Sequence, residues 1–138
     1  MKLYDINGNL QSKNVSKYKI RWTKKSRSKI QFTVKQFLKP YWKNHVVFEE
    51  FPVFGTMMKV DLLNATTKIA IEVQGKQHSE FNEFFHGVSR MNYLRAIKRD
   101  QQKSKWLFDN GFKLIEINEE EIKTLPSNSL LKKLRLPV

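Results

Sequence analysis

The sequence contains no cysteine, which excludes disulfide bonds and thiolate metal sites and suits a reducing compartment. No apolar run approaches the roughly 20 residues that are needed to span a bilayer. The N-terminal residues also lack the apolar stretch of a signal peptide. Together these absences predict a cytoplasmic protein that makes no membrane contact.

Acidic residues are scarce relative to basic ones, with 13 Asp and Glu against 26 Lys and Arg, giving a net charge of +13. Such an excess predicts a polyanionic partner, and nucleic acid is the leading candidate. The basic residues are densest between positions 13 and 29, where there are eight of them and no acidic residue. This segment is either a nucleic-acid contact or a solvated basic face.

At 138 residues the chain is long enough for one hydrophobic core and too short for two ordinary domains. We expect one globular unit at residues 28–138, preceded by a basic β extension at residues 1–27. Within this extension, Asn7-Gly8 predicts a hairpin turn, and residues 18–22 alternate between apolar and basic as in an edge strand. The extension is therefore expected to be a small basic hairpin.

Two amphipathic helices are expected in the globular unit. The first begins at Ser28, which fits a capping box with Gln31, and ends or kinks close to Lys39 because a proline follows. The second runs from about residue 92 to residue 110 and is closed by Gly111. The expected core faces are Ile30, Val34, Phe37, Leu38 and Tyr41 in the first helix, and Leu94, Ile97, Ser104, Leu107 and Phe108 in the second.

Four strands are predicted around these helices. They cover residues 46–51, 58–63, 68–74 and 112–117, with a turn at residues 64–67 and a short basic helix at residues 128–135. The first three form an antiparallel meander, and the fourth follows a helical crossover. The predicted fold class is α/β, with a mixed central sheet flanked by helices.

A pair of carboxylates is expected on one face of this sheet. Side chains alternate along a strand, so Ala70, Glu72 and Gln74 share a face. A two-residue turn places Asp61 of the preceding strand diagonal to Glu72, and a four-residue turn places it directly opposite, with β-carbons about 5 Å apart. Two carboxylates this close repel unless a cation lies between them, so Mg²⁺, or Mn²⁺ in its place, is the expected cofactor. The alternative is that both residues face solvent separately, with Glu72 paired to a lysine.

The spacing of Asp61, ten residues, and then Glu72-Val73-Gln74 resembles the PD-(D/E)XK nuclease superfamily, which has the restriction-endonuclease-like fold. Residues 48–117 look like its very-short-patch-repair-like branch, which includes small phage and homing endonucleases. The matching pieces, in the family's order, are EEFPV with Glu50, Val60-Asp61, Ile71-Glu72-Val73, GKQH at residues 75–78, and RDQQKSKWLFDNGFKLIEI at residues 99–117.

The resemblance implies a Mg²⁺ site formed by Asp61 and Glu72, with the main-chain carbonyl of Val73 as a third ligand. Glu50 would be a further acidic residue of the site, while Glu49 would point to the opposite face of its strand. The resemblance places such a protein in a bacterial or phage-infected host cell.

The sequence departs from the family pattern at two positions. Val60 replaces the usual proline, which changes no chemistry. Gln74 replaces the usual lysine, and an amide orients water but supplies no positive charge. Lys76 is a candidate to replace that charge, and His78 matches a histidine that acts as general base or phosphate contact in similar proteins.

Further residues are assigned to double-stranded DNA and to a dimer. Asp100 and Lys103 match an acidic and basic pair of the family and are expected to turn toward the site. The expected DNA contacts are Lys24, Lys25, Arg27, Lys76, Arg90, Arg95, Lys98, Arg99 and Lys103. A homodimer would cut both strands, and Tyr41-Trp42 and Phe84-Phe85 are candidates for its interface, although packing in the core is the favoured interpretation of both pairs.

The sequence thus predicts a Mg²⁺-dependent DNA endonuclease. Two other functions stay open at this point. One is a non-catalytic nucleic-acid-binding module in which Gln74 marks a decayed site, and the other is a basic structural protein of a ribonucleoprotein or virion.

Overall fold

The arrangement of helices and strands comes from a computed structural model that describes residues 1–75, 90–125 and 128–136. The elements are, in order, β1 (Lys2–Tyr4), β2 (Leu10–Ser12), the 3₁₀ helix η1 (Ser16–Tyr18), α1 (Lys29–Trp42), β3 (Val47–Pro52), β4 (Lys59–Asn64), β5 (Ile69–Gln74), α3 (Arg90–Asp109), β6 (Lys113–Asn118), α4 (Glu119–Lys123) and α5 (Asn128–Lys133). The predictions for Lys76, His78, Phe84 and Phe85 lie outside the described residues.

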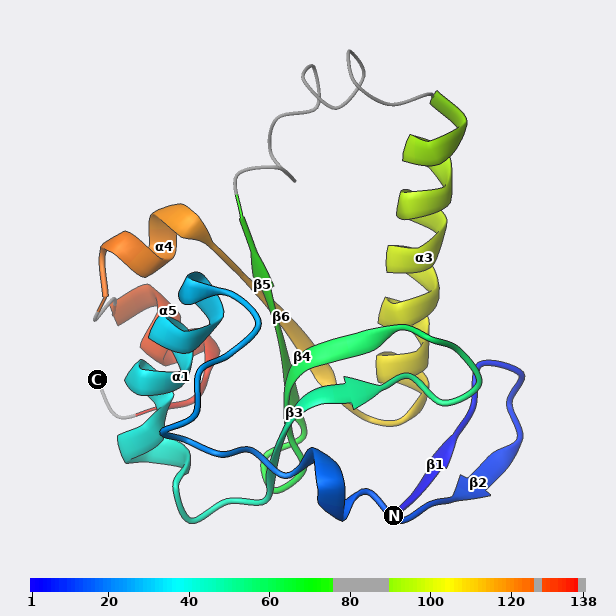
Figure 1. Ribbon diagram of the computed structural model, residues 1–138, viewed down its shortest axis with the longest axis horizontal. Helices are drawn as coiled ribbons and strands as arrows, with labels where there is room; N and C mark the ends of the chain where they lie inside the picture. The colour runs from blue at the N-terminus through cyan, green and yellow to red at the C-terminus, as the bar shows by residue number, and fades with distance from the viewer. Residues whose placement is uncertain (76–89, 126–127, 137–138) are drawn as a thin grey trace.

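The larger sheet has the strand order β3-β4-β5-β6, with β3, β4 and β5 antiparallel and β6 parallel to β5. The predicted meander with a crossover strand is therefore confirmed. Helices α1, α4 and α5 lie on one side of this sheet and α3 lies on the other (Figure 1). Ile69 and Ile71 of β5 pack in the cluster that contains α1, whereas Ala70 packs in the cluster that contains α3.

Helix α1 begins where the sequence predicted. Ser28 is its N-cap, and the side-chain oxygen accepts the backbone N–H of Gln31 at 3.1 Å. The helix continues through Pro40 to Trp42, so the predicted end near Lys39 is wrong. A proline in the last turn removes only the backbone bond to the residue four earlier, and little helix remains to be disturbed.

The buried face of α1 differs from the predicted one. Val34 and Leu38 are buried as expected, but the face also includes Gln31, Lys35 and Trp42. Trp42 packs inside the α1 cluster and is fully buried, so it is a core residue, as the favoured interpretation has it, and not a contact of a dimer interface.

Helix α3 closes at Gly111, which has a φ of +81° as expected. Its predicted core face is largely wrong, because Leu94, Ser104 and Phe108 are exposed. Its fully buried residues, within the described part of the chain, are Trp106 and Leu107. Only the C-terminal turns of α3 pack against the sheet (Figure 1), so a stripe extended along the whole helix overestimates its core face.

The N-terminal hairpin turns at Gly8, as predicted, and pairs Leu3 with Gln11. The edge strand that we predicted at residues 18–22 is wrong. Asn14 accepts hydrogen bonds from the backbone and hydroxyl of Ser16, which favours a 3₁₀ turn over a strand. Contact with β3 is reduced to a bridge at Lys19 and one bond from the N–H of Ile20.

No helix in the described residues is both long and apolar enough to cross a membrane.

Candidate active site

Strands β4 and β5 bring Asp61 and Glu72 together. Their ladder pairs Leu62 with Ile71, and the same register, continued by one residue, sets Asp61 opposite Glu72. The four-residue connection predicts this directly opposed arrangement. At this position side chains replace the ladder: the N–H of Asp61 donates to Glu72 Oε2 at 3.0 Å, and the N–H of Val73 donates to Asp61 Oδ2 at 2.8 Å. Both carboxylates are thus held at the point where the two strands separate.

Glu50 of β3 is the third carboxylate at this position. The β3–β4 register pairs Glu49 with Leu62 and Phe51 with Val60, so Glu50 falls opposite Asp61. Glu50 has a φ of +52°, a left-handed conformation that costs a non-glycine residue about 1–2 kcal/mol. A strained residue of this kind often marks a functional site.

The strain at Glu50 also changes the course of the strand. Strict alternation would place Phe51 on the α1 side of the sheet, together with Glu49. Instead, Phe51 packs against Phe48 and against Trp106 of α3, with ring centroids 5.1 and 6.3 Å away. The left-handed residue therefore shifts the alternation and turns the end of the β3–β4 hairpin toward α3.

Glu49 and Glu50 have different surroundings, since Glu50 lines the cleft between α3 and the β3–β4 hairpin and Glu49 does not. Glu49 faces α1, where its carboxylate accepts bonds from Lys35 Nζ at 2.9 Å, Gln31 Nε2 at 2.9 Å and Ser26 Oγ at 2.6 Å. Gln31 Nε2 also donates to Glu50 Oε1 at 3.2 Å. One amide therefore links the buried network of α1 to the carboxylate at the site.

Lys35 fixes the basic segment that precedes α1. Its side chain is fully buried, and its Nζ donates to the backbone carbonyl of Lys24 at 2.7 Å as well as to Glu49. With the bond from Ser26 to Glu49, the segment from Lys24 to Ser26 is held against β3 and α1. Helical periodicity did not predict this network, whose signal in the sequence is a glutamine at i and a lysine at i+4 on the inner face of an amphipathic helix.

The pKa of Asp61 is raised from 3.8 to about 7. Burial is the largest cause, and the charge of Glu72 is the next. The hydrogen bond from Val73 lowers the pKa, while a side-chain hydrogen bond with Glu72 and the charge of Glu50 raise it further. Near neutral pH, Asp61 is therefore about half protonated, and the proton offsets the repulsion between the carboxylates.

Lys103 of α3 brings a positive charge to the same place. Its Nζ donates to Oε1 of Glu72, and both side chains are largely buried, with 17% and 15% of their surface exposed. We predicted Lys103 as a DNA contact that turns toward the site. The structure places it toward the site, where its partner is the candidate metal ligand itself.

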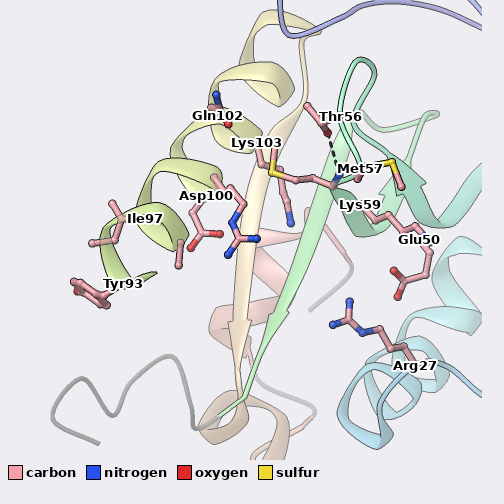
Figure 2. Close-up of a pocket in the computed structure, with 13 residues that line it drawn as sticks. Arg27, Glu50, Thr56, Met57, Lys59, Tyr93, Ile97, Asp100, Gln102 and Lys103 are labelled. Atoms are coloured by element: carbon pink, nitrogen blue, oxygen red, sulfur yellow. Dashed lines mark hydrogen bonds between the residues drawn. The ribbon is translucent and has the colours of Figure 1, made fainter. Parts of the chain in front are cut away.

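A cleft of about 1120 Å³ lies between α3 and the end of the β3–β4 hairpin. Arg27 and Glu50 lie on one side of it, and Tyr93, Ile97 and Asp100 of α3 lie on the other (Figure 2). Asp61 and Glu72 are not among the lining residues, but Lys103, which lines the cleft, donates a hydrogen bond to Glu72. The remaining lining residues are Thr56, Met57, Met58, Lys59, Ala96, Arg99 and Gln102.

Four other residues that were predicted for the site do not line the cleft. Gln74 ends β5, is half-buried and does not line the cleft. Lys24 and Lys25 are exposed, and Arg95 lies on an exposed face of α3. Their roles, and that of the Val73 carbonyl, stay predictions.

The carboxylates fit a hard divalent cation. Within the described ranges, no group of three or more His, Asp or Glu side chains is arranged to hold a metal ion. Mg²⁺, however, is usually bound through one or two carboxylates together with waters and substrate phosphates. Asp61 and Glu72, with Glu50 across from Asp61, supply that donor set.

The chain is similar to uncharacterized proteins of two viruses. It is 32% identical over 87 residues to uncharacterized protein 033L of invertebrate iridescent virus 3, a match that covers 63% of this chain and 44% of that protein. It is 35% identical over 66 residues to uncharacterized protein 094L of frog virus 3 (isolate Goorha), covering 48% of this chain and 43% of that protein. The chain thus spans less than half the length of these curated relatives. No family model matches it, and no solved structure matches it.

The raised pKa of Asp61 predicts how stability changes with pH. Between pH 3.8 and about 7 the folded protein holds a proton on Asp61 that the unfolded chain has lost. The free energy of unfolding of the metal-free protein should therefore fall with rising pH, by up to about 1.4 kcal/mol per pH unit from this group, and level off above pH 7. Urea unfolding in EDTA between pH 5 and 8 measures this, and Asp61→Asn should remove that part of the slope. An identical slope in the variant would show that Asp61 titrates normally.

Proposed function

We propose that the chain is a Mg²⁺-dependent DNA endonuclease. The observation that carries this proposal is the convergence of Glu50, Asp61 and Glu72 from three adjacent strands, beside a cleft that Glu50 lines together with Arg27, Arg99 and Lys103. A structural sheet gains nothing from placing two further carboxylates where their charges raise the pKa of Asp61. A cation and a phosphodiester would turn that repulsion into attraction.

The residues have separate roles in this proposal. Asp61 and Glu72 hold Mg²⁺, which when bound polarises a phosphate and lowers the pKa of water. Asp61 must lose its proton for this, so metal binding should strengthen as the pH rises through 7. Glu50 lies across from Asp61 and is positioned to hold a water molecule by hydrogen bonding.

The positive charges that the chemistry needs come from outside the strand. Gln74 stands where similar nucleases have a lysine, and its amide is limited to orienting water. Lys103 already touches Glu72 and supplies the charge that offsets the developing negative charge on the phosphate. Arg27 and Arg99, on opposite walls of the cleft, would contact neighbouring phosphates.

A second function is favoured by the same contact. Because Lys103 neutralises Glu72 without a metal ion, the site is also suited to a non-catalytic module that binds nucleic acid. This module would bind DNA through its basic residues and would show no metal dependence.

The two functions are separated by incubating supercoiled plasmid with the full chain and either Mg²⁺, Mn²⁺ or EDTA. The nuclease should nick or linearise the plasmid in either metal, and EDTA should stop it. Glu72→Gln should remove the activity, and Asp109→Asn should not, because Asp109 is 44% exposed and forms its ion pair, among the described residues, with the exposed Lys105 of the same helix. DNA binding without cleavage in any metal would favour the second function, and absence of both would contradict the two proposals together.

A further inference from the structure

The cleft is lined by both cationic and apolar side chains, and binding of intact duplex DNA does not require both. Its cationic residues include Arg27 and Arg99 on opposite walls. Its apolar lining includes Met57 from the β3–β4 connection, and Tyr93 and Ile97 from α3 (Figure 2). Met57 is 96% exposed, so this side chain serves no core.

Each kind of lining fits a different part of one nucleotide. Arginine and lysine bind phosphates, whereas aromatic and apolar side chains pack on the faces of bases. In a duplex the base faces are stacked on one another, and only the edges are presented in the grooves. Side chains that pack on base faces are therefore useful only to an unpaired strand.

The depth of the site supports the same substrate. Lys103 lines the cleft and forms an ion pair with Glu72, and both side chains are only about one-sixth exposed. A scissile phosphate must therefore enter the cleft to reach them. The cleft volume of about 1120 Å³ is comparable with that of small-molecule pockets, which is about 300–1,000 Å³. A flexible single strand enters a cleft of this size more readily than a strand held in a stiff double helix.

The cleft wall is also built to be rigid. The bonds from Lys35 and Ser26 to Glu49 fix the segment that leads to Arg27, and Gln31 links that network to Glu50. A preformed site does not spend binding free energy on ordering its own loop.

From these observations we infer that the cleft binds an unpaired DNA strand, so that the substrate carries a single-stranded segment, such as a flap or fork, at the bond that is cut. Only the cleavage part of this inference rests on the proposed nuclease function. The binding part stands on the lining of the cleft alone, so the two parts fail separately.

Fluorescence anisotropy of labelled DNA with the full chain in EDTA tests the binding part. Single-stranded and forked probes should bind at least tenfold more tightly than a duplex of the same length in about 0.15 M salt. An abasic strand, which keeps the phosphates and loses the bases, should lose most of this preference. Equal affinity for all four probes, or no binding to any of them, would overturn the inference.

Variants locate the contact. Met57→Ser and Tyr93→Ala should each weaken single-strand binding about fivefold to tenfold and change duplex binding by less than twofold. Phe108→Ala is the matched control, because Phe108 is 80% exposed on α3 and does not line the cleft. Met57 is so exposed that its replacement leaves folding intact, and unchanged single-strand binding by both cleft variants would overturn the inference.

Cleavage in Mg²⁺ then separates this inference from the proposed function. Forked DNA that is cut at its unpaired arm, with little cutting of the duplex, supports both. Tight single-strand binding without cleavage in any metal supports the binding part of the inference and contradicts the proposed nuclease function. Duplex cut as fast as forked DNA supports the nuclease and overturns the inference.

Discussion

Asp61→Asn is expected to reduce DNA cleavage by at least about a thousandfold, because a metal-bound phosphate gains several kcal/mol in the transition state. The same change should raise the melting temperature of the metal-free protein at pH 8 by on the order of 5 °C. The cause is that the ionised carboxylate is disfavoured by burial and by the charge of Glu72. The Asn oxygen still accepts the N–H of Val73, and its amide nitrogen donates to Glu72. Plasmid cleavage and thermal unfolding measure the two effects.

The opposite signs of these effects make the prediction specific. Replacing a residue with a purely structural role would lower both the activity and the stability of the protein. Replacing a carboxylate that serves metal binding lowers the activity and raises the stability of the fold. Calorimetric titration with Mn²⁺ should show loss of binding in the variant. DNA binding in EDTA should stay unchanged. Full cleavage by Asp61→Asn would show that cleavage does not require the Asp61 carboxylate. A lower melting temperature of the variant at pH 8 would contradict the raised pKa of Asp61.

The carboxylate pair was predictable because it depends on local rules. Alternation along the strands places Asp61 and Glu72 on one face with either a two-residue or a four-residue turn, and the observed connection of residues 65–68 sets them opposite each other. These rules hold wherever a strand is regular, and β4 and β5 are regular up to this position.

The left-handed conformation of Glu50 was not predictable, because it interrupts the alternation of side chains on which the predictions for the strands depend. A sequence pattern favours Gly, Asn or Asp for positive φ, and Glu gives no such signal. The surroundings impose it: Phe51 and Phe48 both pack on the α3 side, and only a change of phase between them allows this. A tertiary contact therefore decides a local backbone angle.

The buried lysine and the partner of Lys103 were missed for a related reason. A lysine on the inner face of a helix stays buried only if a carboxylate meets it, and Glu49 lies 14 residues from Lys35 in sequence. Glu72 and Lys103 are 31 residues apart. Helical and strand periodicity assign faces within an element, but they carry no information on which charge faces which across the core.

Lys103→Met should reduce cleavage by about a hundredfold or more, the size of effect expected when one charged donor that stabilises a transition state is removed. Gln74→Lys in the Lys103→Met background should restore part of the lost activity. Gln74 is two residues from Glu72 on the same strand face, so a lysine there returns the charge to the site. Single-turnover cleavage at saturating Mg²⁺ measures both variants.

Lys105→Met is the matched control for the same helix, since Lys105 is 75% exposed and, within the part of the chain that the structure describes, pairs with Asp109 alone. It should leave cleavage unchanged. Recovery by Gln74→Lys distinguishes a lost charge from a damaged fold, because a second substitution on another element would not repair packing. If Lys103 merely occupied the place of the cation, its removal would instead tighten Mg²⁺ binding and leave cleavage equal or faster. That outcome would assign Lys103 to the metal-free resting state and leave the charge at the phosphate to Arg27 or Arg99 across the cleft.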